Sequence, residues 1–362
     1  MEHSNGRKHD VHAMPPQAIC DLYRHYQKLD NAAIDADINI VDFRRGLTPN
    51  QQERIVPVDT VSSEVIVEAE KAFKTAHGQD QAVKDAAPPP CTIYEHKEFQ
   101  GLRLLPSLLP SECQLLMLDS ILHRDLSNPL HTINLTHDYQ IPYPPTSSSG
   151  GRASFFAYPQ FHPSGSQTFQ PLDPHSTNKP LNAAQFLQKK LRWLTLGDQY
   201  NWSTRSYPTE SPTPFPSDIA AFVTTLFKKT FVPESGVVLL YSPKDYMPVH
   251  RDVSEQCEHN LASFTLGCDG LFIISRNQEP FDSPGEEQEM VVIRVRSGDV
   301  VEMGGETRWA WHAMPKVMAN TCPTFMQDWP VKQGQGTPRA YEKWKGYMKG
   351  KRLNISCRQV WN

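Results

Sequence analysis

The chain has 362 residues, 38% of them hydrophobic, which suffices for one large or two modest domains around an apolar core. It contains no run of 18 apolar residues, and its N-terminus is polar, which argues against a membrane span and a signal peptide. We therefore expect an intracellular protein of the nucleus, cytoplasm or mitochondrion. The formal net charge of −4 lacks the strong basic excess of many nucleic-acid-binding domains, so such binding would need a local basic patch.

Residues 1–90 are mixed and polar and carry one short helical pattern, formed by Ile19, Leu22, Tyr23 and Tyr26. We interpret them as a partly helical N-terminal extension packed on the main domain, which occupies residues 91–362. Within that domain, residues 138–180 are rich in proline, serine and threonine and predict a long flexible insertion.

Three further helices are predicted before residue 235. The first starts at Ser111, which can cap it with Gln114 at the capping-box position. The second runs from about residue 183 to residue 194. The third starts at Ser217 or Asp218 and buries one apolar face, formed by Ile219, Phe222, Val223, Leu226 and Phe227.

The pattern changes after residue 235 to short strand-like runs separated by turn residues. These runs are residues 236–242, 261–267, 270–275, 290–296, 299–303, 308–314 and 352–361. Many short strands in succession favour a sandwich, barrel or jelly roll over about residues 235–362. Because the helices precede the β-rich half, the predicted fold class is α+β.

His250 and Asp252 form the first candidate site, since they lie two residues apart after a strand-like run and can grip one ion. An exposed loop pair is the alternative, because with 14 histidines such spacing arises by chance roughly half the time. His312, between Gly305 and Pro315, is the candidate third ligand, although a lone histidine is more often a satisfied core residue. Two histidines and a carboxylate make the facial triad of non-haem Fe(II) oxygenases.

The run RLNISCR near the C-terminus alternates polar and apolar residues. As a strand it would separate two faces, Arg352, Asn354, Ser356 and Arg358 against Leu353, Ile355 and Cys357. Two guanidiniums on one face favour a ligand with two carboxylates. An exposed edge strand with solvated arginines is the alternative. Together with the triad, the run predicts an iron site that also holds a dicarboxylic acid.

Four ordered motifs resemble the AlkB family of dioxygenases: YSPKDYMPVHRD, SFTLG followed by GLFIIS, SGDVVEMGGETRWAWH, and RLNISCRQ. The resemblance covers roughly residues 190–362 and extends thinly over the rest of the chain. The segments LRWLTLGDQYNW and TPFPSD place it nearest the eukaryotic AlkB homologue 1 branch. It implies a double-stranded β-helix, which is a jelly roll, flanked by helices, and a dioxygenase that uses Fe(II), 2-oxoglutarate and O2.

The resemblance also implies roles for individual residues. The implied iron ligands are His250, Asp252 and His312. The implied 2-oxoglutarate ligands are the two arginines, one for each carboxylate, and two hydrogen-bonding side chains: Arg352, Arg358, Asn354 and Tyr241. Trp193 and Tyr200 match the nucleotide-recognition region, where an aromatic ring can stack on a flipped base, although a tryptophan on a helix face is as often a core residue.

The chain departs from the family pattern at three places. Leu239 stands where the family usually has asparagine, which removes a polar contact to the co-substrate, and Ser356 replaces the usual threonine. The stretch between His312 and Arg352 is longer than in bacterial relatives. It contains a basic segment, residues 339–352, which is the candidate electrostatic guide for a nucleic acid or otherwise a solvated loop.

The implied activity is oxidative demethylation of N-methylated bases in DNA or RNA, including tRNA, and hence a role in DNA repair or tRNA modification. A looped or single-stranded substrate is expected, because a base inside a stacked duplex cannot reach a buried metal. Three alternatives stay open: the same chemistry on a protein side chain or a tRNA 5-methylpyrimidine, zinc hydrolysis, and a non-catalytic nucleic-acid-binding relative. The paired arginines argue against zinc hydrolysis. The oligomeric state is not predicted.

Overall fold

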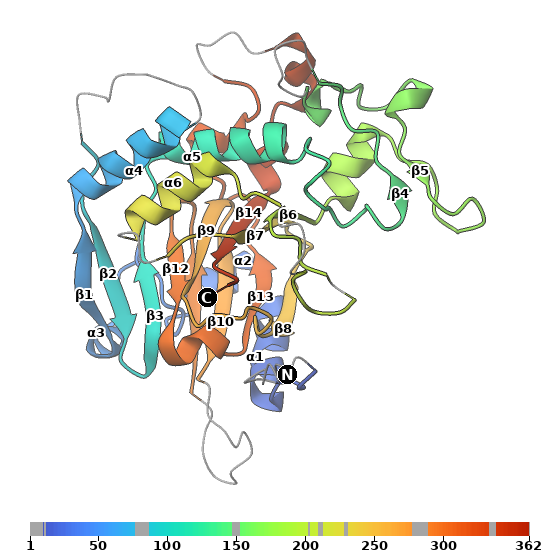
Figure 1. Cartoon of the computed structure of the whole chain (residues 1–362). Helices are drawn as coiled ribbons and strands as arrows, with labels where there is room; N and C mark the ends of the chain where they lie inside the picture. The colour runs from blue at the N-terminus through green and yellow to red at the C-terminus, as the bar shows by residue number, and fades with distance from the viewer. Residues whose placement is uncertain are drawn as a thin grey trace, which may run out of the picture.

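The computed structural model describes residues 10, 12–76, 87–146, 153–201, 203–208, 213–227, 231–276, 289–332 and 338–361. Figure 1 shows two facing antiparallel sheets with helices over the outer faces, so the α+β expectation is confirmed. Among the described residues, no helix is long and apolar enough to cross a membrane.

The larger sheet has eight strands. Their order is β1 (Ile55–Val61), β2 (Cys91–His96), β3 (Phe99–Leu105), β12 (Val300–Met303), β9 (Leu261–Gly267), β14 (Arg352–Arg358), β7 (Ser235–Tyr241) and β6 (Trp193–Gly197). The smaller sheet has four strands, in the order β11 (Met290–Val295), β10 (Gly270–Ser275), β13 (His312–Val317) and β8 (Met247–His250). A separate two-stranded sheet pairs β4 (Tyr139–Gln140) with β5 (Gln170–Pro171).

The helices cover both outer faces. On the larger sheet lie α4 (Ser63–Ala76), α5 (Ser111–Asp119) and α6 (Ser217–Leu226), and α5 continues into the π-helical η1 (Ser120–Asp125). On the smaller sheet lies α1 (Gln17–Lys28), whose Ile19 and Tyr26 are buried against β10 and β13. Short helices α2 (Asn31–Ala36), α3 (Pro49–Arg54) and α7 (Thr324–Gln327) complete the α-helical set of the described chain.

Three apolar clusters follow from this layering. The largest joins the outer face of the larger sheet to its helices, and it includes Phe73, Phe222 and Ile355. A second lies between the two sheets, and a third lies beneath α1. Because side chains alternate along a strand, one face of each central strand of the larger sheet packs into the largest cluster. The other face points into the space between the sheets.

Three expectations about the elements are corrected. Ser111 begins α5, but no capping box forms, because the Gln114 side chain instead donates to the Leu109 carbonyl (2.8 Å) and accepts from Ser297 Oγ (2.6 Å). The helix expected over residues 183–194 ends early: the π-helical η4 (Gln185–Lys190) is followed by strand β6. The run at 308–314 starts in a 3-10 turn, η5 (Gly305–Trp309), and only becomes strand at His312.

Other expectations hold. The helix predicted after residue 216 is α6, with Ile219, Phe222, Val223 and Leu226 buried. The remaining strand predictions after residue 235 correspond to β7, β9, β10, β11, β12 and β14. The proline-rich insertion is anchored by Phe155, Phe156 and Phe169, which are all buried. Residues 147–152 of that insertion lie outside the described residues, and its flexibility stays a prediction.

Candidate functional site

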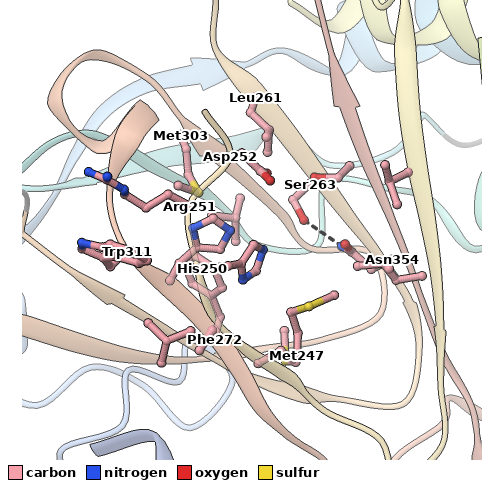
Figure 2. Close-up of a pocket in the computed structure, with 18 of the residues that line it drawn as sticks. Met247, His250, Arg251, Asp252, Leu261, Ser263, Phe272, Met303, Trp311 and Asn354 are labelled. Atoms are coloured by element: carbon pink, nitrogen blue, oxygen red, sulfur yellow. Dashed lines mark hydrogen bonds between the residues drawn. The ribbon is translucent and has the colours of Figure 1, made fainter. Parts of the chain in front are cut away.

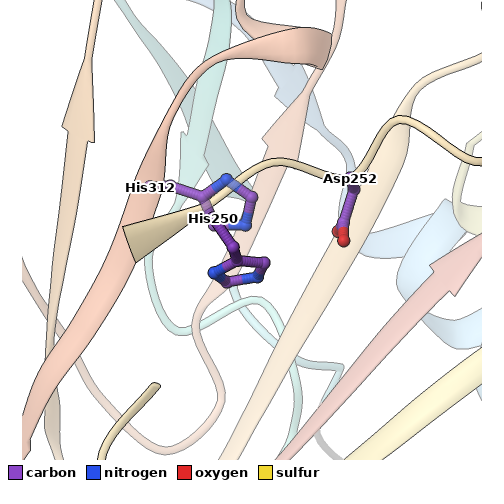
Figure 3. Close-up of side chains that lie close together, drawn as sticks. All are labelled: His250, Asp252 and His312. Atoms are coloured by element: carbon purple, nitrogen blue, oxygen red, sulfur yellow. The ribbon is translucent and has the colours of Figure 1, made fainter. Parts of the chain in front are cut away.

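The three candidate metal ligands lie close together beside strands β8 and β13 of the smaller sheet. His250 ends β8 and His312 begins β13, and these two residues are directly paired across the strands. Side chains of a directly opposed pair lie on one face, and the two imidazole centroids are 4.3 Å apart. Asp252 follows β8 by two residues, and one ligand atom from each of the three residues lies within 4.8 Å of the others (Figure 3).

Backbone contacts prepare both imidazoles for a metal. The Nδ1 atoms of His250 and His312 lie 2.8 and 3.0 Å from the carbonyl oxygens of Pro248 and Ala310. A carbonyl can only accept, so each Nδ1 carries a proton, and in a neutral imidazole this tautomer leaves the Nε2 lone pair for a metal. Burial, with a smaller electrostatic contribution from the neighbouring His250, lowers the pKa of His312 to about 4, so the His312 imidazole is neutral at physiological pH.

Asp252 is ionised by its neighbours. Burial works against the charged carboxylate, but the Arg358 guanidinium and the nearby imidazoles outweigh it and hold the pKa of Asp252 well below its usual range. The candidate donor set is therefore two imidazole nitrogens and one carboxylate oxygen, which fits a divalent ion such as Fe(II) and leaves coordination positions open.

A buried ion-pair chain supports this carboxylate. Arg358 lies 3.2 Å from Asp252 Oδ2 and 3.0 Å from Glu255 Oε1, and Arg308 lies 2.9 Å from Glu255 Oε2. Arg308 also donates to the Asp252 carbonyl at 2.8 Å. The side chain of Glu255 is fully buried, and Tyr207 donates a hydrogen bond to it. These ion pairs therefore attach the loop that carries Asp252 to the end of β14.

Arg352 differs sharply from Arg358. It is only 2% exposed, and its Nη2 donates a hydrogen bond to Thr265 Oγ1 (2.9 Å). Among the described residues it has no carboxylate partner, and its Nε has no acceptor. Burial lowers the pKa of Arg352 to about 10. An unpaired buried cation is costly, so this geometry calls for an anion from outside the chain.

The two arginines face one pocket of about 460 Å³ between the sheets. As predicted, the polar residues of β14 line the pocket while Leu353, Ile355 and Cys357 lie in the outer core. The β7 residues Tyr241 and Leu239 line the pocket as well, and the Asn354 amide donates to Ser263 Oγ at 2.7 Å (Figure 2).

The two residues that are expected to contact the nucleotide, Tyr200 and Trp193, lie at different positions relative to the pocket. Tyr200 lines the pocket beside Arg205, and its hydroxyl lies 3.3 Å from Ser254 Oγ. Trp193 begins β6 opposite Leu239, so it lies on the pocket side of the sheet, one strand further out, but it does not line the pocket itself. It is a strand residue, which corrects its expected position on a helix.

Sequence reasoning missed Glu255, Arg308 and Tyr207. The first two are 53 residues apart and are joined only by the fold, so no local pattern marks them. The one available signal was Glu255 itself, an acidic residue three positions after Asp252, but a single glutamate at that spacing is not diagnostic.

The ion-pair chain leads to a stability prediction. Glu255→Gln should lower the free energy of unfolding by about 3 kcal/mol, because the buried Arg308 and Arg358 lose a shared anion. Glu258→Gln, an exposed change in the same segment, should alter it by less than about 0.5 kcal/mol. Denaturant unfolding of both variants measures the difference, and equal stabilities would contradict a buried, charged Glu255.

Comparison with known proteins gives consistent matches. The family model described as "2OG-Fe(II) oxygenase superfamily" matches residues 161–358. The chain is 36% identical to the N6-methyladenosine RNA demethylase ALKB1 of Pyricularia oryzae, over 97% of each chain. It is 43% identical to the N6-methyladenosine RNA demethylase ALKBH of Cryphonectria parasitica, over 61% of this chain and 97% of that one. It is 31% identical to the tRNA demethylase abh1 of Schizosaccharomyces pombe, over 74% and 82%.

Proposed function

Since the chain belongs to the 2OG-Fe(II) oxygenase superfamily, in the AlkB homologue 1 branch, we propose that it removes N-methyl groups from adenine in RNA or tRNA by oxidation. The observation that carries the proposal is one pocket that joins a metal-ready triad to a buried arginine, Arg352, for which the described residues supply no counter-anion. The similarity to two fungal N6-methyladenosine RNA demethylases supports N6-methyladenosine as the methylated base. We also infer that the two sheets are the double-stranded β-helix that the family resemblance implies.

The roles of the residues follow from their surroundings. His250, Asp252 and His312 would hold Fe(II), and the iron with 2-oxoglutarate and O2 supplies the oxidation by which the methyl carbon leaves as formaldehyde. Arg352 would bind the carboxylate of 2-oxoglutarate far from the metal, because it is the buried cation without a carboxylate partner among the described residues. Arg358, already paired with Asp252, would orient the carboxylate nearer the metal.

The pocket also has room for a base. At about 460 Å³ it lies within the usual range of small-molecule sites, and it holds more than one small dicarboxylate needs. Its walls beside the triad are apolar, with Met247, Phe272 and Met303 near the two histidines (Figure 2). Such walls exclude water from the methyl group under attack. Tyr200, which also lines the pocket, would contact the flipped nucleotide.

Zinc hydrolysis fits less well. It would use the same triad, but it gives no reason for a buried, uncompensated arginine in the same pocket. The protein-side-chain alternative shares the chemistry and is distinguished only by substrate.

The metal assignment predicts loss of both bound metal and activity. His250→Ala, Asp252→Ala and His312→Ala should each abolish formaldehyde release from an N6-methyladenosine oligonucleotide and reduce bound iron, because three ligands leave no redundancy. Mass spectrometry of the oligonucleotide and metal analysis give the two readouts. Near-normal activity in any two of the variants would show that the triad is assigned wrongly, and wild-type protein that makes succinate but never demethylates would favour another substrate.

The two arginines predict opposite stability effects. Arg352→Met and Arg358→Met should both weaken 2-oxoglutarate binding, by about 100-fold for Arg352→Met, since charge-assisted hydrogen bonds are lost. Without ligand, Arg352→Met should leave stability unchanged or higher because an uncompensated charge is removed, whereas Arg358→Met strands Asp252 and Glu255 and lowers it. Calorimetric titration and thermal unfolding test the pair. Unchanged 2-oxoglutarate affinity in both variants would refute the co-substrate role.

Trp193 supplies a test of nucleic acid as the substrate. Trp193→Ala should lower demethylation more than the uncoupled consumption of 2-oxoglutarate, because a stacking surface worth ~1–3 kcal/mol would be lost while the metal pocket is untouched. Trp193→Phe, which keeps an aromatic face, should recover most of the demethylation. Equal losses in both readouts would mean that Trp193 acts on the pocket and not on the nucleotide.

A further inference from the structure

A second cavity, of about 310 Å³, lies outside the site described above. It opens between η4 and the basic segment, which folds as the 3-10 turns η6 (Arg339–Trp344) and η7 (Tyr347–Gly350). Its lining includes Gln188, Ser242, Lys343, Lys345, Tyr347 and Lys351, and it shares no lining residue with the larger pocket. We call it the Lys351 cleft.

Lys351 is the unusual group in this cleft. The residue is 7% exposed, and its Nζ lies 3.3 Å from both the Gln188 carbonyl oxygen and Ser242 Oγ. The Nζ also lies 5.0 Å from the centre of the Tyr347 ring. Among the described residues no carboxylate pairs with it. Burial, with the charge of Arg192, lowers the pKa of Lys351 to about 8. Buried lysines are rarely left without an anion.

The surroundings add further positive charge. Lys343 and Lys345 line the cleft and are exposed. The positive charge of Arg192, just before β6, also acts on Lys351. The nearby acids are already engaged, since Asp245 pairs with Arg192 at 3.1 Å and Asp328 with Lys345 at 3.4 Å. Glu342 is the remaining acid of the basic segment, and it is exposed. The cleft therefore offers a buried ammonium, a hydroxyl and a cationic rim to an anion.

The cleft is connected to the pocket by β6, β7 and β14. Lys351 immediately precedes Arg352 on β14, and Ser242 immediately follows Tyr241 on β7. The edge strand β6 begins at Trp193, directly after Arg192, whose charge acts on Lys351, and the chain beyond the end of β6 reaches Tyr200 at the pocket. At about 3.3 Å per residue, β14 separates the cleft from Arg358 by about 20 Å. A chain of several nucleotides can bridge that length.

We propose that the Lys351 cleft binds a backbone phosphate of the nucleic-acid substrate, a few nucleotides from the base that enters the pocket. This inference rests on the proposed function and adds a phosphodiester contact to it. A buried ammonium and hydroxyl suit phosphate oxygens, which accept charge-assisted hydrogen bonds, and the exposed lysines at the rim would guide the strand. The contact carries no base specificity, and it favours long substrates over short ones.

The test compares two lengths of single-stranded N6-methyladenosine RNA, of about 4 and about 16 nucleotides. For the long RNA, Lys351→Met should raise Kd about tenfold and reduce the slope of log Kd against log salt by about 0.7, as expected for one lost phosphate contact. Its affinity for the short RNA should not change. Lys343→Met, an exposed change at the rim, should also raise Kd for the long RNA and reduce the salt slope. This second variant tests the cleft even if Lys351→Met fails to fold. Lys349→Met, exposed and outside the cleft, is the matched control.

Each outcome decides the inference. Wild-type affinity and slope in both cleft variants would overturn it, and so would equal losses for the two RNA lengths, which would place the effect at the pocket. Inorganic phosphate that protects Lys351 from amine-reactive labelling, while the variants bind long RNA normally, would assign the cleft to free phosphate and also overturn the proposal. Absence of demethylation on the short RNA, which does not reach the cleft, would instead count against the proposed function.

Discussion

The site depends on how the structure distributes charge along β14. Four polar side chains of this strand point into the space between two sheets, where an unpaired charge is expensive. At one end Arg358 is neutralised by Asp252 and Glu255, and this pairing fixes the loop that carries a metal ligand. At the other end Arg352 is left without an anion among the described residues. At the first end the protein supplies the carboxylates that neutralise the arginine, whereas at the second end an anionic ligand would have to do so.

The chemistry-bearing part of this arrangement could be predicted from sequence because its patterns are local. The alternation of RLNISCR requires only a strand, and β14 is that strand. The spacing of His250 and Asp252 requires only an extended segment. His312 was harder, since its strand begins at the histidine itself and the preceding residues form a 3-10 turn. What brings it to His250 is the pairing of β13 with β8, which no local pattern contains.

The parts that could not be predicted depend on contacts distant in sequence. Strands β1, β2 and β3 were not expected, in part because Pro57 interrupts the first of them, and an edge strand tolerates a proline that a central strand would not. Trp193 falls inside the helix predicted over residues 183–194, yet pairing with β7 makes it a strand residue. Glu255 and Arg308 are distant in sequence, and only the fold brings them together as an ion pair.

The burial of Arg352 also has a consequence for kinetics. His250 and Asp252 are partly exposed, whereas Arg352, which lines the same pocket, is almost fully buried. If Arg352 holds the dicarboxylate as proposed, a nucleotide seated at the triad would obstruct the way to Arg352, so the dicarboxylate would arrive first and its product would leave last. Such a compulsory order gives a distinct initial-rate pattern when both ligands are varied, and random binding would not produce it. The depth of one side chain would thereby set the sequence of events in each catalytic cycle.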